Sequence, residues 1–300
     1  MIVAVVSGKG GTGKTTIAVS LALSLGAEVQ FLDCDVEEPN AHLLLHPEID
    51  RSEPVYLPVP VFLPEKCTGC GRCVEVCAYN ALALIERELL VFNELCHGCG
   101  GCVYFCPEQA LVEDKRAIGT IERGKAGKIA FSRGILNVGE ALVPPVIKAL
   151  RRSADPTADT ILDCPPGTSC PVIQAVRGVD FCLVVTEPTP FGRHDLEVVT
   201  EMLEILGIPC GVIINRADLG DGGIKNFCKE RDIPVLLEVP FKKEIARCFA
   251  AGVPFSKAFP AWRERFRALW AFAQRVLRGD VRSLYQQRKW AVKTDRRDRG

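Results

Sequence analysis

The sequence predicts an α/β fold: a doubly wound, mostly parallel sheet with a small α+β module inserted into it. Apolar, strand-like runs alternate with helical segments before residue 57 and again after residue 113, as in a parallel sheet covered by helices. Between these parts lies a segment with cysteines at regular spacing. At 300 residues, one large domain and one small module account for the length. The expected units are 1–56 and 114–280 for the large domain, 57–113 for the insert, and 281–300 for a basic, flexible tail.

The first strand and helix enclose a glycine-rich loop. The run Ile2 to Val6 predicts a buried strand, a helix is expected from Lys14 to Leu25, and the loop GKGGTGKT matches G-x-x-x-x-G-K-[ST]. Its glycines let backbone N–H groups face a phosphate, and the helix N-terminus adds a positive dipole end. We expect Lys14 to reach the β- and γ-phosphates and the Thr15 hydroxyl to ligate Mg²⁺. The expected ATP contacts are Gly8, Gly10, Gly11, Thr12, Gly13, Lys14, Thr15 and Thr16.

Composition limits the classes of partner and the compartment. The formal net charge is zero, so no overall field attracts nucleic acid or an acidic membrane. The N-terminus leads directly into a strand and no apolar run is long enough to span a bilayer, which predicts a cytoplasmic protein. Fifteen cysteines in such a chain are not expected to form disulfides.

The cysteine spacing predicts iron–sulfur clusters. Residues 67–77 read C-x2-C-x2-C-x3-C, and residues 96–106 repeat the pattern. This is the pattern of bacterial two-cluster ferredoxins, in which the fourth cysteine of each run ligates the other cluster. One [4Fe–4S] cluster is therefore assigned to Cys67, Cys70, Cys73 and Cys106. The other is assigned to Cys96, Cys99, Cys102 and Cys77.

Zinc is the alternative metal for these cysteines, because paired C-x2-C units also form zinc sites. Zinc would leave the third cysteine of each triplet without a role. Short apolar runs at Ala81 to Ile85 and Leu89 to Phe92 fit the small strands of a ferredoxin-like module. Ala78 departs from the pattern, since proline often follows the first run.

Two further acidic motifs lie at the ends of predicted strands. Asp33 and Asp35 follow the strand expected over Glu28 to Leu32, and Asp163 follows the strand expected over Thr160 to Leu162. Mg²⁺ prefers oxygen ligands and keeps several waters, so Asp163 is the expected acid at this ion. The pair Asp33 and Asp35 has an alternative role in capping the next helix.

The loop GKGGTGKTT resembles the signature of the deviant P-loop ATPases (SIMIBI class), which include MinD, ParA, Mrp-type cluster carriers and the nitrogenase iron protein. The resemblance implies that Lys9 reaches the phosphates of a second subunit across a nucleotide-sandwiched dimer. It also implies that Asp35 positions the attacking water and that Asp33 supports the Mg²⁺ shell. Asn215 and Pro240 match positions that contact adenine in this family.

The resemblance extends over nearly the whole chain and implies an ATPase, active as a homodimer or as a heterodimer with a paralogue. The leading hypothesis is that ATP state is coupled to electron transfer, or to assembly or delivery of a metal–sulfur cluster on a client protein. One alternative is a spatial organiser like MinD or ParA, and another is a structural module of a larger redox complex. Nucleic acid is not an expected partner, and the last helix, Ala261 to Leu277, is expected to pack in the core rather than on a membrane.

Overall fold

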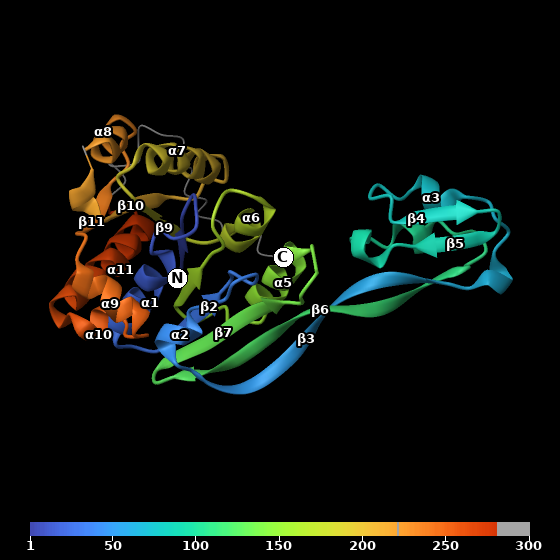
Figure 1. Ribbon diagram of the computed structural model, residues 1–300, viewed down its shortest axis with the longest axis horizontal. Coiled ribbons are helices and arrows are strands. Elements are labelled where there is room, and N and C mark those ends of the chain that lie inside the picture. Colours follow the sequence, from blue (N-terminus) through green and yellow to red (C-terminus); the bar gives the residue numbers. More distant parts are fainter. Residues whose placement is uncertain (221, 281–300) are drawn as a thin grey trace.

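The structure is a computed structural model that describes residues 1–220 and 222–280, so the predicted tail 281–300 lies outside the described residues. The described chain forms a nine-stranded sheet of order β11-β10-β9-β1-β8-β2-β7-β6-β3 and a separate two-stranded sheet, β4-β5 (Figure 1). The predicted α/β class, with a mostly parallel sheet and a small inserted unit, is confirmed.

The strands of the large sheet are β1 (Ile2–Val6), β2 (Val29–Asp33), β3 (Glu48–Phe62), β6 (Leu111–Ala126), β7 (Ile129–Leu136), β8 (Thr160–Asp163), β9 (Phe181–Thr186), β10 (Cys210–Asn215) and β11 (Val235–Val239). The small sheet pairs β4 (Leu82–Ile85) with β5 (Glu88–Val91). The helices are α1 (Lys14–Leu25), α2 (His42–Leu45), α3 (Arg72–Glu75), α4 (Gly101–Tyr104), α5 (Val143–Arg152), α6 (Cys170–Val176), α7 (Pro190–Ile205), α8 (Gly223–Glu230), α9 (Lys243–Ala250), α10 (Phe255–Ala258) and α11 (Arg263–Arg278).

The parallel part of the sheet runs from β11 to β7 and is covered on both faces. Helix α1 packs against α10 and α11, while α5 packs against α6 and α7 against α8. The last helix, α11, buries Phe266, Leu269, Ala273 and Val276, which confirms its predicted packing in the core. Among the described residues, no helix combines the length and apolar content needed to cross a bilayer.

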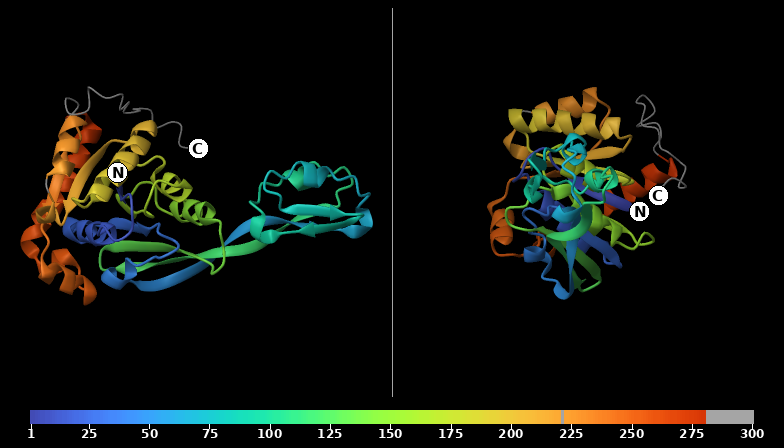
Figure 2. Two further views of the ribbon diagram at one scale, coloured as in Figure 1. Left: turned by 45° about the horizontal axis from the view of Figure 1, so that its top comes forward. Right: turned by 90° about the vertical axis from the view of Figure 1, so that its right-hand side faces the viewer.

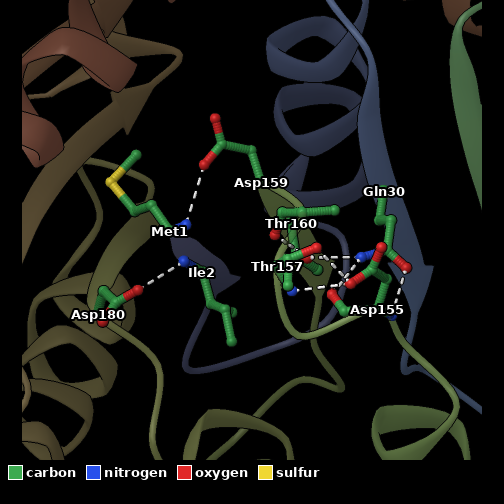
Figure 3. Close-up of polar contacts among 9 residues, drawn as sticks. Met1, Ile2, Gln30, Asp155, Thr157, Asp159, Thr160 and Asp180 are labelled. Carbon is green, nitrogen blue, oxygen red and sulfur yellow. Dashed lines mark hydrogen bonds and ion pairs between the residues drawn. The ribbon is translucent and has the colours of Figure 1, made fainter. Parts of the chain in front are cut away.

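Hydrogen bonds join the amino ends of the central strands (Figure 3). The Met1 ammonium lies 2.9 Å from Asp159 Oδ1, and the Ile2 N–H donates to Asp180 Oδ2 at 2.7 Å. The Gln30 side chain donates to Asp155 O and accepts from the Asp155 N–H. These bonds hold β1, β8, β9 and β2 in register at the edge opposite their carboxyl ends, where the glycine-rich loop follows β1.

The sequence did not predict the length of β3 and β6. Pro54, Pro58 and Pro60 lie within β3, a 15-residue strand that pairs with β6 from Glu48 to Phe62. Proline is tolerated because β3 is the edge strand, where alternate N–H groups have no neighbouring strand to bond. Strands β6 and β7 form a hairpin that turns at Gly127, whose φ is positive.

Beyond the end of β7, the paired strands leave the sheet as a two-stranded ribbon, residues 56–62 and 111–117. Strand β7 pairs with β6 only as far as Leu136 and Gly119. The register of β3 and β6 shifts at this point, because Val55 faces Gly119 but Tyr56 faces Ala117, so Ile118 is the extra residue of a β-bulge. A bulge bends a strand pair and increases its twist. Figure 2 shows the ribbon carrying the cysteine-rich unit away from the large domain.

The unit at the end of the ribbon holds residues 63–110, with α3, α4 and the β4-β5 sheet, and is called the cysteine module below. The predicted small strands are present within one residue of their expected bounds. The predicted boundaries at residues 57 and 113 fall inside β3 and β6, and the division into domains stays a prediction.

The contact between Phe31 of β2 and Phe131 of β7 joins the central sheet to the hairpin that carries the ribbon. Their rings stack with centroids 6.2 Å apart, and Phe131 is buried. We expect Phe131→Ala to lower the free energy of unfolding by about 3–5 kcal/mol, because truncation leaves a cavity. Val138→Ala, at a fully exposed position just after β7, is the control and should change it by less than about 0.5 kcal/mol. Equal effects in chemical denaturation would contradict this role for Phe131.

Candidate functional site

A cleft of about 350 Å³ lies at the carboxyl ends of β1, β2, β10 and β11. The loop between β1 and α1 forms its floor, and the segment after β11 forms one wall. Its lining includes these predicted residues: Lys9, Gly10, Gly11, Thr12, Gly13, Lys14, Thr15, Thr16, Asp35, Asn215 and Pro240. Gly8, Asp33 and Asp163 do not line the cleft. Gly8 packs against α7, where an added Cβ would lie 2.4 Å from Asp195 Cβ.

Lys14 is buried among the three predicted aspartates. Its Nζ donates to Asp163 Oδ1 at 2.7 Å and lies 3.8 Å from Asp35 Oδ2. Asp33 accepts from the Ala41 N–H at 3.0 Å, which holds the start of α2 close to the end of β2. The fold therefore brings residues from β2, β8 and the glycine-rich loop to one point, because β8 lies between β1 and β2.

Burial and charge crowding perturb these groups. Burial alone lowers the pKa of Lys14, but the ion pair and hydrogen bond with Asp163 leave this pKa above its ordinary value. Burial and the neighbouring Asp163 raise the pKa of Asp33 to about 8. Burial, opposed by the Lys14 charge, raises the pKa of Asp35 to about 6. One ammonium thus balances three carboxyl groups only in part.

A divalent cation fits this surplus of carboxyl oxygens. Asp163 Oδ2 is buried and has no hydrogen-bond donor among the described residues. Such an orphaned carboxylate oxygen is suited to a cation or to a water held by one. The residues present therefore fit Mg²⁺, with Asp163 and the Thr15 hydroxyl as the groups that would hold it.

Asn215 bonds to the loop instead of pointing freely into the cleft. Its Nδ2 donates to Thr12 O at 2.8 Å, and its Oδ1 accepts from the Arg216 N–H at 3.0 Å. Both amide groups are thus used within the protein, and the contact of Asn215 with adenine stays a prediction.

Part of the cleft carries no sequence motif. Its wall includes Phe241, Ile245 and Phe255, apolar side chains suited to a flat base, together with Arg216. The three apolar residues come from the segment after β11, from α9 and from α10. Arg216 could have been suspected from its place beside Asn215.

The eight cysteines of the predicted clusters form two groups. One cavity is lined by Cys67, Cys70, Cys73 and Cys106. The other is lined by Cys77, Cys96, Cys99 and Cys102. The fourth cysteine of each run thus joins the first three of the other run. These are the two ligand sets expected from the spacing, and their role as ligands stays a prediction.

The two halves of the cysteine module repeat the same local geometry. Cys77 Sγ accepts from the Ala81 N–H at 3.3 Å, and Cys106 Sγ accepts from the Ala110 N–H at 3.2 Å. Glycines with positive φ precede both short helices, at Gly71 and Gly100. Hydrogen bonds to sulfur stabilise a thiolate and the cluster that it ligates.

The cavities also differ in their position along the ribbon. The cavity of Cys96 lies against Pro58, Val59 and Glu113, whereas the cavity of Cys67 lies against Phe62 and Leu111 at the ribbon's far end. The rings of Tyr79 and His97 stack, with centroids 3.6 Å apart, beside the cavity of Cys96. The two cysteine groups are thus arranged in series away from the large domain.

The doubly wound sheet, the glycine-rich loop and the buried Lys14–Asp163 pair define a P-loop nucleotide-binding protein. The chain belongs to the family described as the CobQ/CobB/MinD/ParA nucleotide binding domain, whose model matches residues 3–255. This is the ATPase family that the resemblance implies.

Several individual proteins have sequences similar to that of this chain. An uncharacterized protein of Methanocaldococcus jannaschii is 31% identical over 265 residues, which cover 86% of this chain and 92% of that protein. An iron-sulfur cluster carrier protein of the same organism is 22% identical over 276 residues, covering 84% and 76%.

Solved structures share the fold. The septum site-determining protein MinD of Pyrococcus horikoshii, complexed with Mg-ADP, matches with a TM-score of 0.57 and 20% identity, covering 92% of this chain and 95% of that one. A MinC:MinD cell division protein complex of Aquifex aeolicus matches with a TM-score of 0.51 and 18% identity, covering 92% and 95%.

We expect Lys14→Ala to weaken MgATP binding by at least about tenfold, because it removes the buried cation that is predicted to contact the phosphates and leaves Asp163 unpaired. Lys148→Ala, on the exposed side of α5, is the matched control and should bind normally. Calorimetric titration measures both, and circular dichroism checks that both fold. A folded Lys14→Ala protein with unchanged affinity would contradict this phosphate site.

Proposed function

We propose that this protein is an ATP-hydrolysing iron–sulfur protein that couples its nucleotide state to electron transfer, or to assembly or delivery of a metal–sulfur cluster on a partner protein. The proposal depends above all on the two groups of four cysteines at the end of a ribbon that starts beside the nucleotide cleft. The relationship to an iron-sulfur cluster carrier agrees with it.

The cysteine groups favour cubane clusters over single zinc ions. Single zinc ions would leave the third cysteine of each C-x2-C-x2-C triplet without a role. A [4Fe–4S] cluster spreads its four ligands around a larger body and supplies one-electron redox chemistry when bound.

Lys14, Asp35 and Asp163 would then act on ATP. Lys14 would neutralise phosphate charge, and Asp163 and the Thr15 hydroxyl would hold Mg²⁺ with Asp33 in support. Asp35 would orient the attacking water. Lys9 would stabilise charge on the phosphates of a second subunit, in a homodimer or in a heterodimer with a paralogue.

A short chain of contacts connects the cleft with the ribbon. Asp35 lines the cleft, and the next residue, Val36, is buried and accepts from the Leu136 N–H at 2.8 Å. Leu136 ends β7 and faces Gly119, beside the bulge at which the ribbon leaves the sheet. Loops that follow the γ-phosphate change conformation with nucleotide state. A shift of Asp35 would therefore reach the base of the ribbon through one hydrogen bond.

Iron content tests the cluster assignment. We expect the anaerobically purified chain to hold about eight irons, and Cys106→Ala or Cys77→Ala to hold about four, because each removes one ligand of one cluster. Cys248→Ala, in α9 outside the module, should keep about eight. Elemental analysis and dithionite-bleached absorbance give the result. Stoichiometric zinc, or no iron, would contradict the proposal.

Hydrogen exchange tests the coupling. We expect MgATP to change exchange at the ribbon amides of the wild-type chain. In Gly134→Ala, a new Cβ would lie 2.6 Å from Val36 Cγ1 and would displace Val36 from Leu136. In this variant, MgATP should still change exchange in the loop that holds Asp35, but not in the ribbon. Val138→Ala should behave as wild type. If MgATP leaves hydrogen exchange in the wild-type ribbon unchanged, the proposed coupling is contradicted. If the protein instead binds liposomes or DNA only with ATP, the spatial-organiser alternative is supported.

A transfer experiment distinguishes cluster delivery from electron transfer. In cluster delivery, the protein loses its iron to an apo-acceptor protein. In electron transfer, the protein keeps its iron while it reduces the acceptor. Iron analysis of both proteins after separation distinguishes these outcomes.

A further inference from the structure

One buried glutamate lies between the two cationic side chains of the nucleotide cleft. Glu187 follows β9, and its side chain is only 10% exposed. Its Oε1 lies 2.8 Å from Arg216 Nη1, and its Oε2 lies 3.8 Å from Lys9 Nζ. Both Lys9 and Arg216 line the cleft. The glutamate therefore contacts residues from the glycine-rich loop and from the end of β10.

The segment TEPTPFG holds this glutamate in place. Thr186 Oγ1 donates to Gly192 O at 2.9 Å, and the Gly192 N–H donates to Thr189 Oγ1 at 3.0 Å. The Thr189 N–H donates to Glu187 O at 2.8 Å. An added Cβ at Gly192 would lie 2.2 Å from Glu187 O, so only glycine allows this tight turn. The turn thus fixes the backbone of Glu187 beside the cleft.

Glu187 attracts Arg216 and Lys9 through its charge, without a well-aligned hydrogen bond to either. Glu187 Oε1 accepts no well-aligned hydrogen bond from the described residues despite its short distance to Arg216. Lys9 is 37% exposed and lies at the outer limit of an ion pair. A buried carboxylate needs a counter-charge, but both cations are themselves partly exposed, Arg216 to 45% and Lys9 to 37%, so a second anion can reach them from the cleft.

We propose that Glu187 competes with nucleotide phosphate for Lys9 and Arg216, and so sets the affinity of the cleft and holds Lys9 away from the chain's own phosphate site. This inference rests on the proposed binding of ATP in the cleft and extends it to a positioning residue. Without phosphate, the glutamate is the counter-ion of both cations. When phosphate binds, it replaces Glu187 as the partner of these cations, and part of the binding free energy is used to separate them from Glu187.

The sign of one substitution distinguishes competition from simple structural support. Glu187→Gln keeps the shape of the side chain and removes its charge, so it should tighten MgADP and MgATP binding by about threefold to tenfold. A residue that merely supported the cleft would weaken binding when changed. Glu187→Asp, which keeps the charge, should return the affinity toward that of the wild type.

The experiment is calorimetric titration of the full-length chain with MgADP and with a non-hydrolysable MgATP analogue. Glu197→Gln is the matched control, because Glu197 lies on α7, pairs with Arg231 at 2.7 Å and is not part of the cleft lining. Its affinity should equal that of the wild type. In a Lys9→Ala background, Glu187→Gln should tighten binding less, since one of the two competing cations is gone.

Two results would overturn the inference. One is a folded Glu187→Gln protein that binds nucleotide no more tightly than the wild type does. The other is a Glu187→Gln substitution that tightens nucleotide binding by the full amount even when Lys9 and Arg216 are both changed to alanine. That result would show a general effect of charge instead of competition for the two cations. A wild-type chain that binds no nucleotide at all would overturn the nucleotide site itself, which the Lys14→Ala experiment tests separately.

Discussion

The pairing of β7 with β2 is the constraint on which the rest of this structure depends. Five residues of each strand lie side by side, from Val29 with Ile129 to Asp33 with Arg133. This register places the aspartates after β2 beside the end of β7, and β7 is the inner strand of the hairpin that continues into the ribbon. Because the two strands run parallel, the nucleotide loops and the base of the ribbon lie at the same edge of the sheet.

The cleft and the cysteine module each bring together several groups of one kind, carboxyl groups in the cleft and thiols in the module. At the cleft, three carboxyl groups surround one buried ammonium, and burial together with the neighbouring Asp163 raises the pKa of Asp33 to about 8. In the cysteine module, burial raises the pKa of the Cys102 thiol to about 11. The proposed cluster would displace the proton of this thiol when it binds.

The antiparallel extension of the sheet explains how a small module can be attached to a P-loop fold without disturbing it. The insert adds β6 and β3 to the free edge beyond β7, so the parallel core from β11 to β7 stays intact. An edge strand can carry several prolines and can leave the sheet at a bulge, because no further strand depends on its hydrogen bonds. The result is a two-stranded ribbon whose base lies beside Leu136, and the Leu136 N–H donates to Val36 O, one residue after Asp35 of the cleft.

The sequence by itself determined the features that depend on local pattern. These are the strand–loop–helix of the phosphate site, which has the predicted bounds Ile2–Val6 and Lys14–Leu25, the alternation that gives the parallel sheet, and the membership of the two cysteine groups. The phosphate loop follows from residues that are neighbours in the chain. The two cysteine groups follow from a repeated spacing that is typical of two-cluster ferredoxins, although each group joins residues from both runs.

Only the tertiary structure decided the features that join distant segments. It extended β3 through three prolines, placed Val36 against Leu136, and brought Glu187 between Lys9 and Arg216. It also filled the cleft wall with Phe241 and Phe255, which no motif marks. These contacts depend on strand order and register in the folded sheet, and local residue preferences carry no information about either.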